Sequence, residues 1–128
     1  MNPLHPPLIT GTLGELLVQA RLLQYDVQAA PPLKDSGNDL IAVRGSVMRA
    51  IQVKATGGDT YDLPEKETRY HILAAVRLVG DGREVKFDQC EVLLIQKGEL
   101  AGLPRQFSQI KAYRLGPERI DVLFPRDK

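Results

Sequence analysis

The sequence predicts a single mixed α/β (α+β) domain in which a helix packs on one central sheet. Three observations indicate this class: a leucine-rich helical stripe in residues 10–25, a hairpin signature in residues 39–54, and a continuous apolar strand in residues 91–96. The 128 residues are 43% hydrophobic and 26% charged, which suits one domain spanning residues 1–128 with one core.

The first elements follow from proline placement and helical spacing. Residues 1–9 carry three prolines and are expected to form an extended lead-in. The helix predicted over residues 10–25 opens with Thr12 and Glu15, which fit a Thr-x-x-Glu capping box. Residues 27–30 are predicted to form a short strand.

A β-hairpin is predicted next. Its strands are residues 39–43 and 47–54, and Arg44, Gly45 and Ser46 form the turn between them. A flexible loop is expected at residues 55–59. It leads into an irregular or short helical connection at residues 61–67, which precedes the next strand.

The second half is predicted to complete the sheet. Strands are expected in residues 70–79 and 91–96, although Ile72-Leu73-Ala74-Ala75 also suits a helix. A short helix over residues 97–103 and a final hairpin of residues 110–115 and 118–124 complete the predicted elements.

Composition excludes several function classes. The formal net charge is +1, so no global field favours nucleic acid or membrane. A single cysteine, Cys90, forms no internal disulfide, and the two histidines lie beside no cysteine cluster that would hold zinc. No signal peptide or membrane span is recognised, and we expect a cytoplasmic protein.

Polar residues of the hairpin stand out as candidate functional residues. Gln52 and Lys54 are two apart on one strand and therefore share a face, and Asp39 opens the neighbouring strand. A cation on an otherwise apolar strand is costly unless it is paired or used. We therefore expect these side chains to gather around one point.

Three short motifs resemble the PD-(D/E)xK nuclease superfamily, which includes restriction endonucleases, Holliday-junction resolvases and intron-encoded homing endonucleases. They are Thr12-Leu-Gly-Glu15, Ser36-Gly-Asn-Asp39 and Ile51-Gln-Val-Lys54. The resemblance covers residues 10–56 and continues loosely to about residue 103. It departs from the family pattern at Asn38, where proline gives the family its name, and at Gln52, where most members carry Asp or Glu. The Gln-x-Lys form is similar to the intron-associated branch.

The resemblance implies a restriction-endonuclease-like mixed sheet with the N-terminal helix packed on it and a second short helix. It also implies a site for Mg²⁺ or Mn²⁺, which prefer oxygen ligands. Asp39, Gln52, Glu15 and the Val53 carbonyl would hold the ion, and Lys54 would be the catalytic cation. Because Gln52 is neutral, we expect weak binding of one ion.

Simpler roles stay open for the same residues. Asp39 suits a strand entry, Lys54 suits a solvated strand end, and Glu15 suits the partner of Thr12 in a capping box.

The expected function is a metal-dependent DNA endonuclease or resolvase-like phosphodiesterase, a hydrolase acting as a homodimer. The alternatives are a catalytically degenerate nuclease-fold module that binds DNA or a protein, and an unrelated interaction domain. Thr56, Arg44 and Arg49 are candidate DNA contacts, although solvated strand-end positions are the simpler expectation for both arginines.

Overall fold

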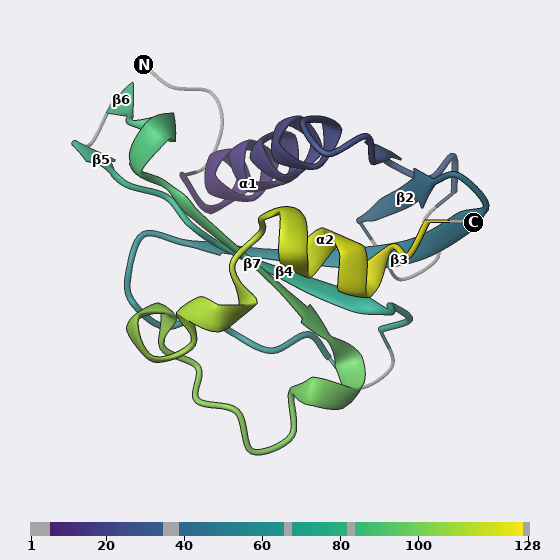
Figure 1. Cartoon of the computed structure of the whole chain (residues 1–128). Coiled ribbons are helices and arrows are strands. Elements are labelled where there is room, and N and C mark those ends of the chain that lie inside the picture. The colour runs from purple at the N-terminus through teal and green to yellow at the C-terminus, as the bar shows by residue number, and fades with distance from the viewer. Residues whose placement is uncertain (1–5, 35–38, 66–67, 82–83, 127–128) are drawn as a thin grey trace.

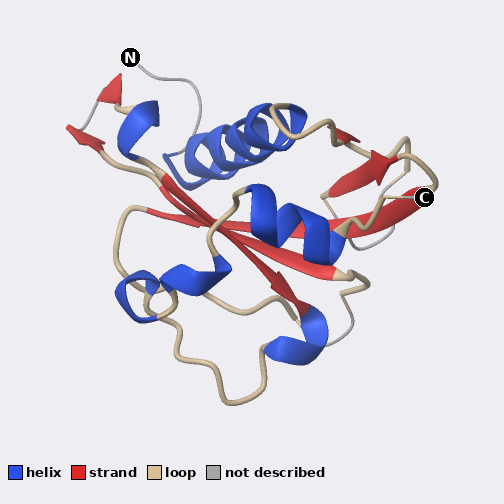
Figure 2. Ribbon diagram, viewed as in Figure 1, coloured by secondary structure: helices blue, strands red, loops and turns tan. Residues whose placement is uncertain are grey.

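A computed structural model describes residues 6–34, 39–65, 68–81 and 84–126 as a mixed five-stranded sheet with helices on one face (Figures 1 and 2). The strand order is β1-β2-β3-β4-β7, in which β3 and β4 are parallel and the other neighbours antiparallel. The sheet strands are β1 (Gln28–Ala30), β2 (Leu40–Arg44), β3 (Val47–Thr56), β4 (Ile72–Arg77) and β7 (Glu91–Gln96). The helices are α1 (Pro6–Leu23) and α2 (Pro117–Leu123), and β5 (Gly80–Asp81) pairs with β6 (Glu84–Val85) outside the main sheet.

The β2–β3 hairpin confirms the predicted hairpin, although Arg44 belongs to β2 and not to the turn. Arg44 pairs with Val47, so the loop contains only Gly45 and Ser46. Gly45 has a φ of 62°, the left-handed conformation that tight hairpin turns require and that glycine adopts without steric cost.

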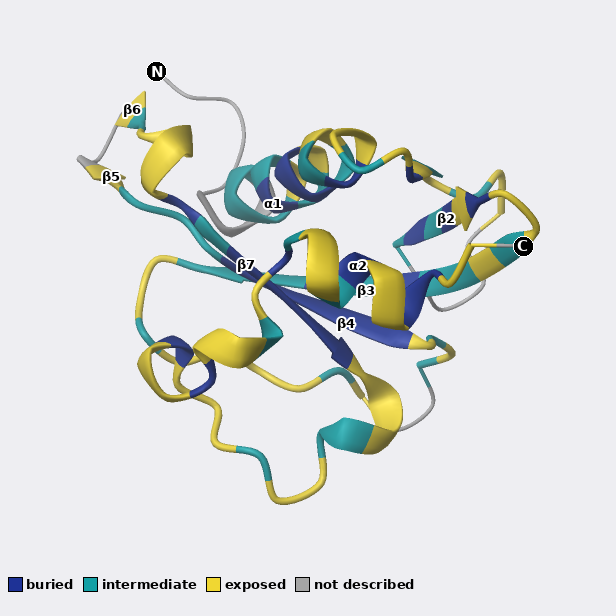
Figure 3. Ribbon diagram, in the orientation of Figure 1, coloured by how far each residue is buried: buried dark blue, intermediate teal, exposed yellow. Residues whose placement is uncertain are grey.

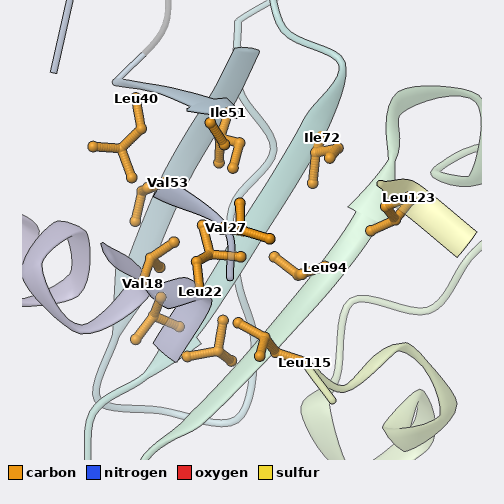
Figure 4. Packing of buried hydrophobic residues seen from close by; sticks show 14 of the residues in the cluster. Val18, Leu22, Val27, Leu40, Ile51, Val53, Ile72, Leu94, Leu115 and Leu123 are labelled. Carbon is orange, nitrogen blue, oxygen red and sulfur yellow. The ribbon is translucent and has the colours of Figure 1, made fainter. Parts of the chain in front are cut away.

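The main core lies between the sheet and the two helices (Figure 4). Val18 and Leu22 of α1 and Leu123 of α2 belong to one buried cluster with Ile51 and Ile72 of the sheet. On β3 the residues of this cluster alternate with the others, so one face of the strand is apolar and packed against the helices.

On the opposite face of the sheet, a second buried cluster covers only the half formed by β4 and β7. Loop residues Tyr61 and Phe107, whose rings meet edge to face at 5.8 Å, pack with Leu73 of β4 and Leu93 of β7. No residue of β2 or β3 belongs to this second cluster. Over β2 and β3 this face is only partly covered: Val43 and Met48 are exposed, and Gln52 and Lys54 are half-buried. We call this part the open half of the sheet (burial is coloured in Figure 3).

Helix α1 begins earlier than expected. Residues 6–9 of the predicted lead-in are helical, and prolines suit the first helical turn because its N–H groups have no intrahelical acceptor. Thr12 therefore lies inside the helix and the predicted capping box is wrong. Residues 1–5 lie outside the described part.

The C-terminal prediction also needs correction. Residues 110–124 form 3₁₀ turns and helix α2 instead of a hairpin, and residues 97–103 contain only the 3₁₀ turn Lys97–Glu99. Pro117 occupies the start of α2, while Ile120 and Leu123 bury one side of it at helical spacing. Residues 72–77 are a strand, which settles their ambiguity. Within the described ranges no helix is long and apolar enough to span a membrane.

Candidate functional site

Asp39 is held at the point where β2 begins to pair with β3. Its backbone N–H donates to the Ile51 carbonyl at 3.0 Å, and its Oδ2 accepts the Val53 N–H at 2.8 Å. The side chain thus replaces one rung of the sheet ladder, which fixes the carboxylate beside the middle of β3. No described residue donates a hydrogen bond to Oδ1.

Gln52 and Lys54 project from β3 on the face opposite α1. Their partners across the parallel pair are Leu73 and Ala75, which belong to the cluster on that face. Both polar side chains are half-buried, and neither makes a hydrogen bond or ion pair with any residue in the described ranges. The amide and the ammonium are therefore free to bind a ligand on the open half of the sheet.

Helix α1 lies directly against β3 at Gly14. A Cβ added there would lie 2.7 Å from Cβ of Ala55 and 3.6 Å from Cγ1 of Val53. This contact fixes the height of the helix over the strand. Glu15, the next residue, is thereby held close to the sheet.

The Glu15 and Asp39 carboxylates share one electrostatic environment. Partial burial raises the pKa of Glu15, and the negative charge of Asp39 raises that pKa further. The structure brings these two groups within electrostatic range of each other. It forms no ion pair between Lys54 and either carboxylate, and Lys54 lies on the side of β3 away from α1.

Replacing Glu15 by glutamine is expected to stabilise the metal-free protein at neutral pH. A raised carboxyl pKa means that the folded state binds more protons than the unfolded state between pH 4.5 and the folded pKa. The Glu15 carboxyl therefore does not lower the free energy of unfolding at pH values below 4.5. The free energy of unfolding then declines as pH rises through the folded pKa of Glu15. We expect Glu15→Gln to raise the melting temperature at pH 7 in EDTA by about 1–3 °C.

The same comparison at pH 4 should show little difference, because Glu15 is then protonated in both states. A melting temperature that falls at pH 7, or rises equally at both values, would contradict the shared environment. Thermal unfolding followed by circular dichroism gives this measurement.

The donors around Asp39 suit a hard cation. They comprise the Asp39 and Glu15 carboxylates and the Val53 carbonyl, which belongs to the same residue as the N–H bound by Asp39. Gln52, like Lys54, projects from the face of β3 opposite α1. No group of three His, Cys, Asp or Glu side chains that could hold a metal occurs among the described residues. The set therefore has oxygen ligands of low total charge.

The three candidate DNA contacts have different surroundings. Thr56 ends β3, and its Oγ1 accepts the Gly58 N–H at 3.1 Å. Arg49 is half-buried and donates to the Met48 carbonyl at 3.1 Å. Arg44 is buried, so the expectation of a solvated strand end is wrong for it.

Arg44 binds the C-terminal helix. Its Nη1 donates to Asp121 Oδ1 at 2.8 Å and to the Phe124 carbonyl at 2.9 Å. The Arg44 side chain holds α2 against the hairpin. Because it is used in this contact, it is not proposed as a nucleic-acid contact.

The fold is α+β, a mixed five-stranded sheet with two α-helices. A solved structure, "The structure of a bacterial homing endonuclease: I-Ssp6803I", superimposes with a TM-score of 0.63 over 94% of this chain and 93% of that chain. The two sequences are 13% identical, so the likeness is one of fold. No protein-family model and no curated protein sequence matches the chain.

Proposed function

We propose that this protein is a divalent-metal-dependent endonuclease that hydrolyses phosphodiester bonds of DNA. The observation that carries the proposal is the Asp39 carboxylate, held by the Val53 N–H next to Glu15 and beside the Gln-x-Lys strand. The nuclease-like fold supports it.

We assign each residue a role in this proposal. Glu15, Asp39, Gln52 and the Val53 carbonyl would hold Mg²⁺ or Mn²⁺, which supplies Lewis-acid polarisation of the phosphate and an activated water when bound. The Val53 N–H keeps Asp39 oriented. Lys54, which has no protein partner among the described residues, would stabilise the negative charge that develops on the phosphate oxygens.

A catalytically degenerate DNA-binding module is the second candidate. The observation favouring it is that the site has two carboxylates where a strong divalent site would have more. Such a module would bind DNA without a metal requirement.

Metal titration of the wild type and Gln52→Glu separates the two candidates. We expect Mg²⁺ and Mn²⁺ to raise the melting temperature of the wild type and to permit nicking of supercoiled and branched DNA. Gln52→Glu adds a third carboxylate, so it should bind Mn²⁺ about tenfold more tightly, equivalent to about 1.4 kcal/mol.

Gln89→Glu, an exposed change outside the main sheet that also adds one negative charge, is the matched control. A melting temperature that does not respond to metal, together with intact DNA binding and no nicking, would favour the degenerate module. Metal binding that is unchanged by Gln52→Glu would remove residue 52 from the ligand set.

We also propose a homodimer as the active form. Specific protein–DNA interfaces bury about 1,000 Å² or more of protein surface, and a pair of protomers would present two sites to two strands. Sedimentation velocity at micromolar concentration tests this, and a purely monomeric species bound to cleaved DNA would exclude it.

A further inference from the structure

A cavity of about 360 Å³ opens at the end of the sheet where β4 begins and β7 ends. Arg49, Tyr70, His71, Gln96 and Lys97 contribute to its lining, and none of the described residues that line it is acidic. The sequence separates these residues by up to 48 positions, so no motif announces the cavity. Its lining combines two permanent cations with an imidazole.

The imidazole of His71 is held in one tautomer. Its Nδ1 accepts the Ala50 N–H at 2.8 Å, while its own backbone N–H donates to the Ala50 carbonyl at 2.8 Å. Because Nδ1 acts as the acceptor, the neutral ring carries its proton on Nε2. The exposed side of the ring therefore offers a hydrogen-bond donor.

Lys97 is positioned by three interactions. Its ammonium lies 4.7 Å from the centre of the Tyr70 ring and donates to the Thr68 carbonyl at 3.3 Å, and its backbone N–H donates to the His71 carbonyl at 2.9 Å. An ammonium has three donors, so two remain for a ligand. The aromatic ring holds this cation in place without neutralising its charge.

The carboxylate of Glu99, close to Gln96 and Lys97 in the sequence, is already engaged. Glu99 accepts the Gln96 N–H at 2.8 Å and forms an ion pair with Arg119. Arg49 uses one guanidinium donor on the Met48 carbonyl and forms no ion pair within the described ranges. The donors of the cavity therefore suit an anion with several oxygen atoms.

We propose that this cavity is a phosphate-binding subsite that holds the DNA backbone beside the cleavage site. The inference rests on the proposed nuclease function. His71 is bonded to Ala50, which lies two residues from Gln52 on β3, a separation of about 7 Å along a strand. A phosphate held by Arg49, His71 and Lys97 would fix the register of the strand presented to Asp39 and Lys54.

Inorganic phosphate tests the cavity without DNA. The chain has two histidines, His5 and His71, so the ring-proton signals in the NMR spectrum are few and readily assigned. At constant pH and ionic strength, phosphate should shift the His71 ring signal saturably and leave His5 unchanged. The shift should disappear in Lys97→Gln.

DNA binding in EDTA tests whether the cavity holds the DNA backbone. For Arg49→Gln and Lys97→Gln we expect affinity for a 30-base-pair duplex to fall at least about fivefold. The salt slope should fall by about one for each phosphate that the variant no longer neutralises. Lys111→Gln, an exposed change on the 3₁₀ turn Lys111–Tyr113, is the matched control and should leave both values unchanged.

The outcomes separate this inference from the proposed function. No His71 shift with phosphate overturns the subsite. A shift without any effect of the two variants on DNA binding overturns its assignment to the backbone. Weakened DNA binding in the variants supports the subsite even where the wild type, given Mg²⁺ and Mn²⁺, fails to nick DNA; that failure would overturn the hydrolase proposal alone.

Discussion

Lys54→Ala is expected to lower the DNA cleavage rate by about 10²–10³-fold, the decrease seen when one donor to a developing oxyanion is removed. Lys54 makes no hydrogen bond or ion pair with a described residue and is half-buried on the open half of the sheet. Its removal should leave the fold intact, so the melting temperature should stay within about 2 °C of the wild type. Single-turnover nicking of supercoiled DNA measures the rate.

Two variants make the Lys54 experiment decisive. Lys54→Arg keeps the charge but spreads it over a planar group, so we expect partial activity. Lys86→Ala removes an exposed lysine elsewhere and should cleave like the wild type. Equal residual activity in wild type and Lys54→Ala would take Lys54 out of the mechanism.

Gly14→Ala is expected to destabilise the protein by about 1–2 kcal/mol, although alanine normally favours a helix over glycine. The added Cβ would lie 2.7 Å from Cβ of Ala55, and neither group can rotate away. Overpacking of this kind costs about 1–3 kcal/mol, part of which the helix preference offsets. Because α1 must move away from β3, Glu15 should leave the vicinity of Asp39 and cleavage should fall as well.

Gly11 provides the matched control on the same helix. A Cβ at Gly11 would meet nothing within 4 Å, so Gly11→Ala should stabilise the protein by up to about 1 kcal/mol. The double variant Gly14→Ala/Ala55→Gly removes the clashing methyl group and should recover most of the stability and activity of the wild type. If Gly14→Ala instead behaves like Gly11→Ala in urea unfolding, the close approach of helix and strand is wrong.

Elements with strong local signals could be predicted from sequence. Gly45 marks the hairpin turn because few other residues accept its φ, and the four apolar residues between Glu91 and Gln96 have the length of a buried strand. The helix start was predicted wrongly because Thr12 and Glu15 match a capping pattern by spacing alone, while proline is equally suited to a first turn. The C-terminal hairpin was predicted wrongly because, over so short a length, four or five apolar residues fit the spacing of a strand as well as that of a helix.

In the candidate site too, some contacts could be predicted from the sequence and others could not. Residues on neighbouring strands, such as Asp39 and Val53, could be brought together from the hairpin register alone. The proximity of Glu15 depends on how α1 docks at Gly14, which no local pattern specifies. The roles of Arg44 and Lys97 depend on partners distant in sequence, so they emerged only from the three-dimensional arrangement.

The bond between Asp39 and the Val53 N–H makes positions 39 and 52 unequal in their tolerance of substitution. Asp39→Ala would remove a proposed metal ligand and also let the first residues of β2 fray, whereas Asp39→Asn keeps an acceptor for that N–H. Gln52 has no such structural duty among the described residues. Substitutions at position 52 can therefore change the proposed metal ligand without disturbing the fold. A single change at this position could convert an active form of the protein into an inactive one, or the reverse.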